Sequence, residues 1–524
     1  MTLTAAAMLL AAIGLLPVVT MVADSFFADG RFSVRAYEAF LATSREQAGP
    51  IVHSILLSSL TSALATIAGV TLGLLFGKTD LPLRYALATL FAIPLLLPSY
   101  VVAVAWFAVI GKSGLVGQAL PSTASELLSS AFFGLYGCAA VLFTTFTPIV
   151  MFLTIAYLGA VNPQWENAAR LASGWPAILR RITLPLIAPG VAFAAVLVFL
   201  LAFGEVGVPT YLRYPVYPVE ALTRFAAFYD FRTATVSTMP MLLVTATILI
   251  LERQLSRENG YELRAAAPVE QRAQIELGYW RLPIFAIVSA WAFVSVLLPL
   301  LALLIQSSSI WVYVDAFSRA SDSILHSLVF AVIGATLLTL LGFFCGMLIR
   351  DPAQPLARAV DGSALFLFTL PGTVIGIGLI DLWNRPMTNL VYGTPAIIVL
   401  GYLAQYSVLP MRITSATLGG LPRSLEDAAR LSGASWFTTL TRIVAPLARR
   451  GLVAAWLIGY VFCLRDLGIS MVVYPPGYDP LPVRILTLMA NGAPSLIAAL
   501  CIILIAATLL PLGALGLWLR YGGR

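Results

Sequence analysis

Few side chains in this sequence could do chemistry, and its two histidines are the first to consider. His53 and His326 occupy equivalent places in two similar stretches, VHSILLSS and LHSLVFAV. A metal site needs several ligands that converge, and neither histidine is accompanied by a carboxylate or a second histidine. We therefore expect no metal site on the chain. Two interpretations remain: symmetric polar anchors at an interface, or metal ligands.

Two Gly-Lys pairs raise the question of nucleotide binding. A phosphate-binding loop needs the pattern G-x-x-x-x-G-K-[ST]. The stretches GKT at Gly77 and GKS at Gly111 complete only its end, because Leu72 and Trp106 stand where the first glycine is required. We therefore expect no catalytic residue, no nucleotide site and no bound cofactor, and predict that the chain is not itself an enzyme.

Two acidic residues recur at equivalent positions in GEVGVPTYLRYP and RDLGISMVVYPP. Glu205 and Asp466 lie at the ends of predicted membrane segments. Ionisable side chains at membrane depth usually face a cavity or a partner, since exposing a charge to lipid is costly. We predict that they pair with Arg224 and Arg484 or line the outer mouth of a pathway. An ordinary interfacial position is the alternative.

The clearest repeat is a pair of polar stretches in an otherwise apolar chain. ENAARLASGWPAILRRITLP falls within residues 162–185, and EDAARLSGASWFTTLTRIVAP falls within residues 422–446. We call them the first and second polar loops. In the second loop, Glu426 and Asp427 should begin a short helix, because acids favour the positive end of a helix dipole.

The turn of the second polar loop has its own signals. Gly433 can end the first helix in the left-handed conformation, and Ser435 can cap a second helix. The first polar loop is one residue shorter here, so either Ser173 or Gly174 takes the place of Gly433. Two short helices joined by a tight turn make a stiff protrusion that suits contact with a partner.

The elements that must hold these residues are membrane spans. The chain has 524 residues, of which 60% are hydrophobic and only 10% are charged. Soluble globular proteins carry roughly a quarter charged residues. Apolar segments long enough to cross a bilayer recur along the chain. We predict an all-α polytopic membrane protein with about 12 transmembrane helices, near residues 3–23, 53–76, 85–110, 131–158, 186–206, 233–251, 282–306, 325–348, 361–384, 392–413, 451–472 and 494–519.

The predicted spans form two tandem repeats of six. The first repeat covers residues 1–251, a charged linker covers 252–281, and the second repeat covers 282–524. An even number of spans makes the two repeats parallel, with a pathway expected between them. Pro98 and Pro371 are equivalent prolines inside predicted spans, where either packing kinks or gate hinges would result.

The distribution of basic residues predicts the orientation of the chain in the membrane. With the N-terminus in the cytoplasm, 20 of the 31 Lys and Arg residues fall on the cytoplasmic side, in line with the positive-inside rule. Both termini and both polar loops are then cytoplasmic. The net charge of +7 is explained without a nucleic-acid partner.

The polar loops resemble the cytoplasmic signature of permease subunits of bacterial binding-protein-dependent ABC importers, E-A-A, three residues, Gly, nine residues, Ile, one residue, Leu-Pro. In the second loop, aspartate replaces the usual glutamate, and Ala445 replaces the leucine. The residues of this loop that match the signature are Asp427, Ala428, Ala429, Gly433, Ile443 and Pro446. Asn167 stands at the acid position of the first loop, beside Glu166, and the matches are Ala168, Ala169, Ile182, Leu184 and Pro185.

This resemblance covers essentially the whole chain as two fused permease domains of the type I ABC importer fold. It implies a bacterial inner-membrane protein on which a homodimeric ATP-binding subunit, carrying ATP and Mg²⁺, docks from the cytoplasm. It further implies a periplasmic binding protein that delivers the substrate. The residues expected to couple to the ATPase are Glu166, Asn167, Ala168, Ala169, Arg170, Gly174, Glu426, Asp427, Ala428, Ala429, Arg430 and Gly433.

Within this family, YPPGYDPLPVRILTLMANGAP looks most like iron(III) importers, so ferric iron is the expected substrate. Importers of thiamine, phosphonate or polyamine are alternatives. A 12-span secondary transporter is a remote alternative, because it would need mid-span acids for ion coupling, and these are nearly absent. A membrane-embedded enzyme would need a cluster of reactive side chains that the sequence does not offer.

Overall fold

The protein is almost entirely helical in the computed structural model, which describes residues 2–28, 31–42, 44–112, 114–228, 231–258, 274–351 and 354–521. The predicted all-α polytopic class is confirmed. A single short antiparallel ladder among the described residues joins β1 (Phe27–Ala28) to β2 (Arg31–Phe32). Half of the predicted linker, residues 259–273, lies outside the described residues.

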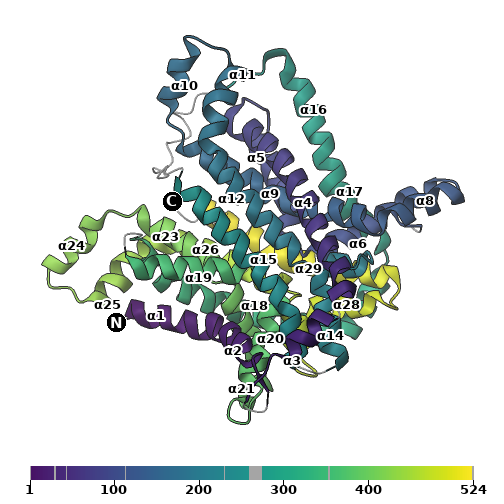
Figure 1. Cartoon of the computed structure of the whole chain (residues 1–524). Coiled ribbons are helices and arrows are strands. Elements are labelled where there is room, and N and C mark those ends of the chain that lie inside the picture. The colour runs from purple at the N-terminus through teal and green to yellow at the C-terminus, as the bar shows by residue number, and fades with distance from the viewer. Residues whose placement is uncertain are drawn as a thin grey trace. The chain divides into compact units, whose positions relative to one another are not determined.

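Two compact units divide the chain, and they do not follow its order (Figure 1). Unit 1 comprises residues 1–44, 221–242 and 311–524, and unit 2 comprises residues 45–220 and 243–310. Each unit therefore contains the first helices of the other predicted repeat. The boundaries of the repeats themselves stay a prediction.

Most helices fall within one unit. Those of unit 1 are α1 (Thr2–Leu10), α2 (Leu16–Asp24), α3 (Arg35–Ala42), α18 (Ile310–Ile349), α19 (Pro355–Thr369), α20 (Gly372–Trp383), α21 (Asn389–Tyr392), α22 (Ala396–Tyr406), α23 (Val408–Gly419), α24 (Arg423–Leu431), α25 (Trp436–Thr439), α26 (Ala445–Arg465), α27 (Ser470–Val473), α28 (Leu481–Met489) and α29 (Pro494–Tyr521). Those of unit 2 are α4 (Ser44–Lys78), α5 (Arg84–Leu96), α6 (Ser99–Ile110), α7 (Leu115–Ala119), α8 (Ser122–Phe132), α9 (Leu135–Ala160), α10 (Pro163–Arg170), α11 (Trp175–Ile178), α12 (Leu184–Phe203), α13 (Gly207–Tyr211), α16 (Arg281–Ala292) and α17 (Leu298–Gln306). Two unit boundaries fall within α14 (Tyr217–Phe228) and α15 (Phe231–Glu258), and the other two fall after the first residue of α4 and of α18.

Ten helices in the described part of the chain are long and apolar enough to cross a membrane. Two bent pairs, α19 with α20 and α22 with α23, bring the number to 12 if each pair is one span. The bends are 107° and 52°. The predicted number of spans thus fits, but the predicted continuous spans 361–384 and 392–413 are bent pairs.

Proline explains why two of the predicted spans are interrupted. The span predicted over residues 85–110 is two helices, α5 and α6, with Leu97 extended at ψ 151° and Pro98 capping α6. Pro371 caps α20 in the same way, after Leu370 at ψ 141°. Proline disfavours the helical conformation of the residue before it, so the helix stops there. Both prolines therefore break the helix completely.

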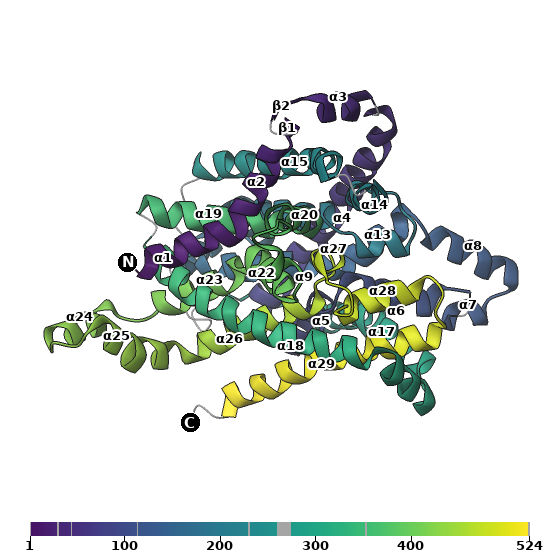
Figure 2. The same ribbon diagram turned by 90° about the horizontal axis from the view of Figure 1, so that it is seen from below.

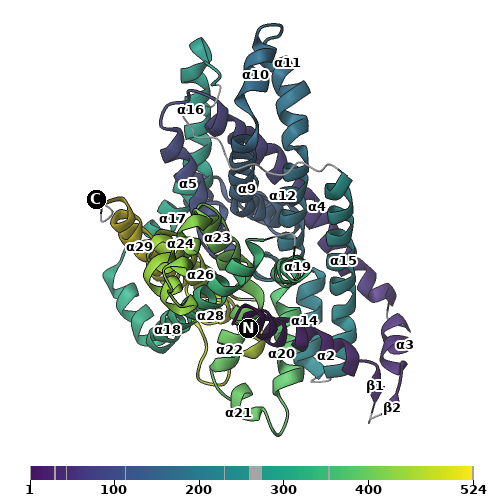
Figure 3. The same cartoon turned by 90° about the vertical axis from the view of Figure 1, so that its left-hand side faces the viewer.

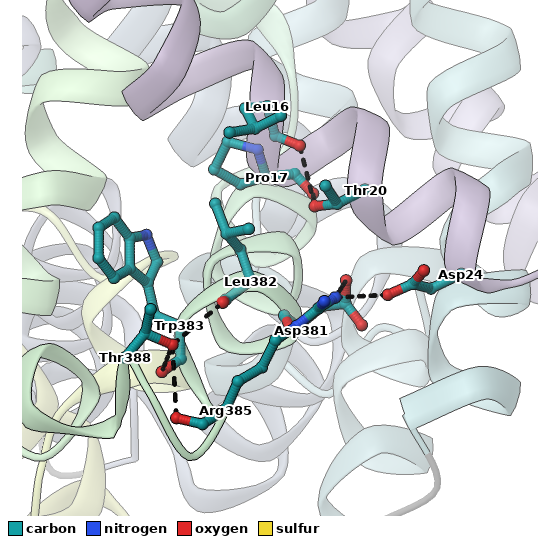
Figure 4. Close-up of polar contacts among 9 residues, drawn as sticks. All are labelled: Leu16, Pro17, Thr20, Asp24, Asp381, Leu382, Trp383, Arg385 and Thr388. Carbon is teal, nitrogen blue, oxygen red and sulfur yellow. Dashed lines mark hydrogen bonds and ion pairs between the residues drawn. The ribbon is translucent and has the colours of Figure 1, made fainter. Parts of the chain in front are cut away.

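The first helices of the chain pack against the second predicted repeat. A Cβ added to Gly378 of α20 would lie 3.0 Å from the Pro17 carbonyl oxygen of α2. Figure 4 shows Arg385, just beyond α20, between Asp24 at the end of α2 and Asp381. The Arg385 Nη2 atom lies 2.5 Å from Asp24 Oδ2 and 3.7 Å from Asp381 Oδ2. This ion pair secures the end of α2 to α20.

Helix α17, at the end of the first span of the second predicted repeat, packs in turn against α6 of the first. Val296 and Pro299 line the same small cavity as Val101, Val102 and Ala105 of α6. Helix α6 is apolar all round, so it needs neighbours on several faces, and α17 provides one of them.

Glycines let the second and fourth spans of each predicted repeat approach closely. A Cβ on Gly73 of α4 would lie 2.6 Å from Thr154 Cβ of α9. A Cβ on Gly346 of α18 would lie 2.2 Å from Thr414 Oγ1 of α23. Small residues four apart, Gly69 with Gly73 and Gly342 with Gly346, are a common basis of close helix packing in membranes. Each pair of spans is therefore joined with little room for either helix to move alone.

Candidate functional site

The second polar loop forms the helical hairpin that its sequence predicts. Helix α24 ends in a turn where Gly433 has φ +80° and the Ala434 amide donates to the Ala429 carbonyl at 3.0 Å, the arrangement of a Schellman motif. Ser435 then caps α25 and accepts a hydrogen bond from the Thr438 amide at 3.2 Å. Figure 2 shows α24 and α25 projecting beyond the ends of α23 and α26.

The second helix of this hairpin continues into the span. A π-helical turn over Leu440–Val444 connects α25 to α26, and Pro446 stands in the first turn of α26, where its missing N–H costs nothing. No break therefore separates the second helix of this loop from the span at Pro446. A continuous helix from Trp436 to Arg465 thus joins the loop directly to the span.

The first polar loop has the same plan with a different turn. Asn162 caps α10 by accepting from the Gln164 amide at 3.0 Å. Gly174 has φ −76° and stands before α11 as its N-cap, so the shorter turn uses no left-handed residue among those described. The Arg170 guanidinium lies 5.2 Å from the Trp175 ring centroid and bridges the two helices. Figure 3 shows α10 and α11 standing beyond the ends of α9 and α12.

The twelve residues predicted to couple to an ATPase lie together in these hairpins, six in each, and they differ in exposure. Glu166 and Ala429 are buried, and Ala169 and Glu426 are partly buried. The exposed ones are Asn167, Ala168, Arg170, Gly174, Asp427, Ala428, Arg430 and Gly433. Each hairpin thus has one face that is exposed to solvent and one face that packs against the rest of the protein.

Glu166 and Glu426 each form an ion pair with a cation that the sequence analysis did not identify as a partner. Lys78 Nζ forms an ion pair with Glu166 Oε2, and both side chains are at most 2% exposed. Thr183 Oγ1 donates to Glu166 Oε1 at 2.8 Å. In the second loop, Arg350 Nη1 lies 2.6 Å from Glu426 Oε1. A useful signal was present, because each cation follows the apolar stretch of the second span of its repeat.

The sequence analysis also did not identify two exposed leucines at the ends of the hairpins. Leu171 is 92% exposed and Leu431 is 90% exposed. They occupy equivalent positions, each directly after the arginine of its loop. Phe437 of the second loop is 67% exposed. Apolar side chains gathered on a polar protrusion are typical of a surface that contacts another protein.

The predicted outer acids act as caps of short helices. Glu205 Oε1 accepts from the amides of Gly207 at 3.0 Å and Val208 at 3.4 Å, at the start of α13. Asp466 Oδ2 accepts from the Ser470 amide at 2.8 Å, at the start of α27. The sequence analysis missed this shared role, although the glycine two residues after each acid indicates a turn.

Asp466 is buried and has partners other than the predicted Arg484. Tyr406 Oη donates to its Oδ1 at 2.6 Å, and Ser470 Oγ donates to its Oδ2 at 2.6 Å. Arg484 Nη2 instead donates to the Arg319 carbonyl at 3.0 Å. The pairing of Glu205 with Arg224, and the place of all four residues at an outer mouth, stay predictions.

Replacing Asp466 by alanine should lower the free energy of unfolding by about 3 kcal/mol or more, because the hydrogen-bond donors of Tyr406 and Ser470 would lose a charged acceptor. Asp466→Asn keeps one acceptor oxygen and should lose less. Thermal unfolding of the purified protein in detergent measures both. An alanine variant as stable as the wild type would contradict the role given to this carboxylate.

Both histidines lie against a tyrosine of a loop after the fifth span of their repeat. The His53 ring centroid is 5.0 Å from that of Tyr214, and His53 Nδ1 is 3.0 Å from the Pro215 carbonyl oxygen. The His326 centroid is 5.1 Å from that of Tyr478. This equivalence favours the interpretation as symmetric anchors.

This chain is similar to several known proteins. Residues 69–258 match the family described as binding-protein-dependent transport system inner membrane component. The putative ferric transport system permease protein FbpB 1 of Haemophilus influenzae is 22% identical over 447 residues, which cover 81% of this chain and 70% of that protein.

Two further relatives are also named as permease proteins. The ferric transport system permease protein FbpB of Actinobacillus pleuropneumoniae is 22% identical over 445 residues, and this chain spans 64% of its length. The spermidine/putrescine transport system permease protein PotC of Escherichia coli is 29% identical over 210 residues, which cover 36% of this chain and 72% of that protein.

Proposed function

We propose, from the match of residues 69–258 to the binding-protein-dependent transport system inner membrane components, that this chain is a two-repeat permease subunit of an ABC importer. Its relatives are permease subunits, which are not enzymes. ATP hydrolysis therefore falls to a separate subunit, and substrate delivery to a periplasmic binding protein.

The observation that carries this proposal is the pair of equivalent helical hairpins. Each ends in a leucine that is at least 90% exposed, and each continues as helix into a span of the membrane. A symmetric ATPase dimer requires two such contacts. The 20 basic residues predicted on the cytoplasmic side put both hairpins where ATP is available. Both termini lie on this side as well.

Ferric iron is the substrate that we favour, because the relatives that cover most of this chain are named ferric permeases. Spermidine or putrescine is the second candidate, since PotC has the higher identity over a shorter stretch. Thiamine and phosphonate remain alternatives from the sequence resemblance.

Purification of the tagged chain from membranes of its host tests the assembly. We expect an ATP-binding subunit and a secreted binding protein to copurify, and mass spectrometry of the binding protein should identify its ligand. Vesicles that contain the complex should take up that ligand only when ATP is supplied. Uptake driven by a proton or sodium gradient without ATP would instead support a secondary transporter.

A further inference from the structure

Each polar loop is attached to its own repeat at a point remote in sequence. The cation ends the second span: Lys78 is the last residue of α4, and Arg350 follows α18 directly. The acid lies in the first turn of the hairpin: Glu166 in α10 and Glu426 in α24. The two ion pairs therefore join equivalent elements in the two repeats.

Further hydrogen bonds make each ion pair a three-way junction. Glu166 also accepts from Thr183, which lies in the π-helical turn before α12. Arg350 Nη2 donates to the Leu421 carbonyl at 2.8 Å, just before α24. Each junction thus contacts the second span, the first helix of the hairpin and one end of the loop.

Apolar packing supports both junctions. Below the first loop, Leu158, Val161 and Ile187 form a buried cluster against Leu74 of α4. Below the second loop, Phe343 of α18 belongs to one buried cluster with Leu418, Leu440 and Val444. Because the glycines described above join the second span closely to the fourth, a displaced hairpin must carry the second, fourth and fifth spans with it.

We propose that the ion pairs Lys78–Glu166 and Arg350–Glu426 are the joints through which a force on the hairpins reaches the second spans. This inference rests on the proposed function, in which an ATPase applies that force. Glu166 and Glu426 are then positioning residues. They hold each hairpin at a fixed angle to its span and touch neither ATP nor the substrate.

The two joints differ in how far their side chains are exposed to solvent. The side chains of Lys78 and Glu166 are 2% and 0% exposed, whereas those of Arg350 and Glu426 are 13% and 22% exposed. The last part of the linker also supports the first joint: the Ile275 amide donates to the Lys78 carbonyl at 2.7 Å. Breaking a buried ion pair costs more stability than breaking an exposed one, so the second joint is the one that charge substitutions probe with less risk to folding.

The test measures coupling, the ratio of substrate taken up to ATP hydrolysed, in the complex reconstituted in vesicles. Arg350→Glu should lower this ratio about tenfold or more while ATP hydrolysis continues, because two acids then repel each other at the joint. The exchange variant, Arg350→Glu with Glu426→Arg, should restore the ratio to within about threefold. Glu426→Gln, which keeps the volume, should give an intermediate ratio.

Lys112 and Glu126 provide the matched control, since their ion pair is 2.9 Å long and both side chains are more than 60% exposed. Lys112→Glu should leave coupling unchanged. An unchanged ratio in both Arg350→Glu and Glu426→Gln would overturn the joint, as would an exchange variant that is stably assembled yet uncoupled. A wild-type complex without ATP-driven uptake would instead count against the proposed function.

Discussion

Simultaneous replacement of Leu171 and Leu431 by aspartate should abolish ATP-driven uptake. Both side chains are at least 90% exposed at the ends of the hairpins, so a charge there costs the isolated chain little. Each leucine buried against a partner contributes about 2 kcal/mol, so the pair should weaken docking of the ATPase about 1000-fold. Copurification of the ATP-binding subunit and uptake in vesicles measure the loss.

The matched control replaces the same two leucines by methionine, which retains a similar apolar volume. That variant should copurify the ATPase as the wild type does. Either single aspartate variant should keep one contact with the ATPase, and its ATP-driven uptake should be lower than that of the wild type. If the double aspartate variant still copurified the ATPase in full, the hairpin ends would not be the docking surface.

The second large effect concerns stability. Removing Glu166 by alanine should lower the free energy of unfolding by about 3–5 kcal/mol, because Lys78 would keep a buried charge without its partner. Glu426→Ala should cost about 1 kcal/mol, since water reaches Arg350 in part. Thermal unfolding of the purified variants in detergent compares the two.

An apolar replacement of the whole buried pair separates charge from packing. Lys78→Met combined with Glu166→Leu removes both charges and fills a similar volume, so it should recover most of the stability lost in Glu166→Ala. If Glu166→Ala were as stable as the wild type, the Lys78 ammonium would have to reach water, and the burial described for this pair would be incorrect.

Local signals in the sequence predicted the hairpins well. Gly433 and Ser435 have side chains and conformational preferences that act within one turn, and the structure confirms both roles. Hydropathy likewise located the spans, because crossing a bilayer depends on length and composition. The shorter first turn could not be resolved in this way, since either Ser173 or Gly174 fitted the spacing.

Contacts between distant segments could not be predicted from the sequence. Lys78 and Glu166 are 88 residues apart, and nothing near either residue indicates the other. Asp466 had two candidate roles as an acid at a span end, and only the fold brings Tyr406 to its carboxylate. The breaks before Pro98 and Pro371 were visible as prolines, but their extent depends on the packing around them.

The exchange of first helices between the two units has a consequence for biosynthesis. Helix α2 leaves the ribosome roughly 350 residues before α20, which at about 5–20 residues per second is an interval of about 20–70 s. Throughout that time Asp24 has no Arg385 to bind. A nascent chain interrupted before α20 therefore leaves Asp24 without the cation that it binds in the finished chain.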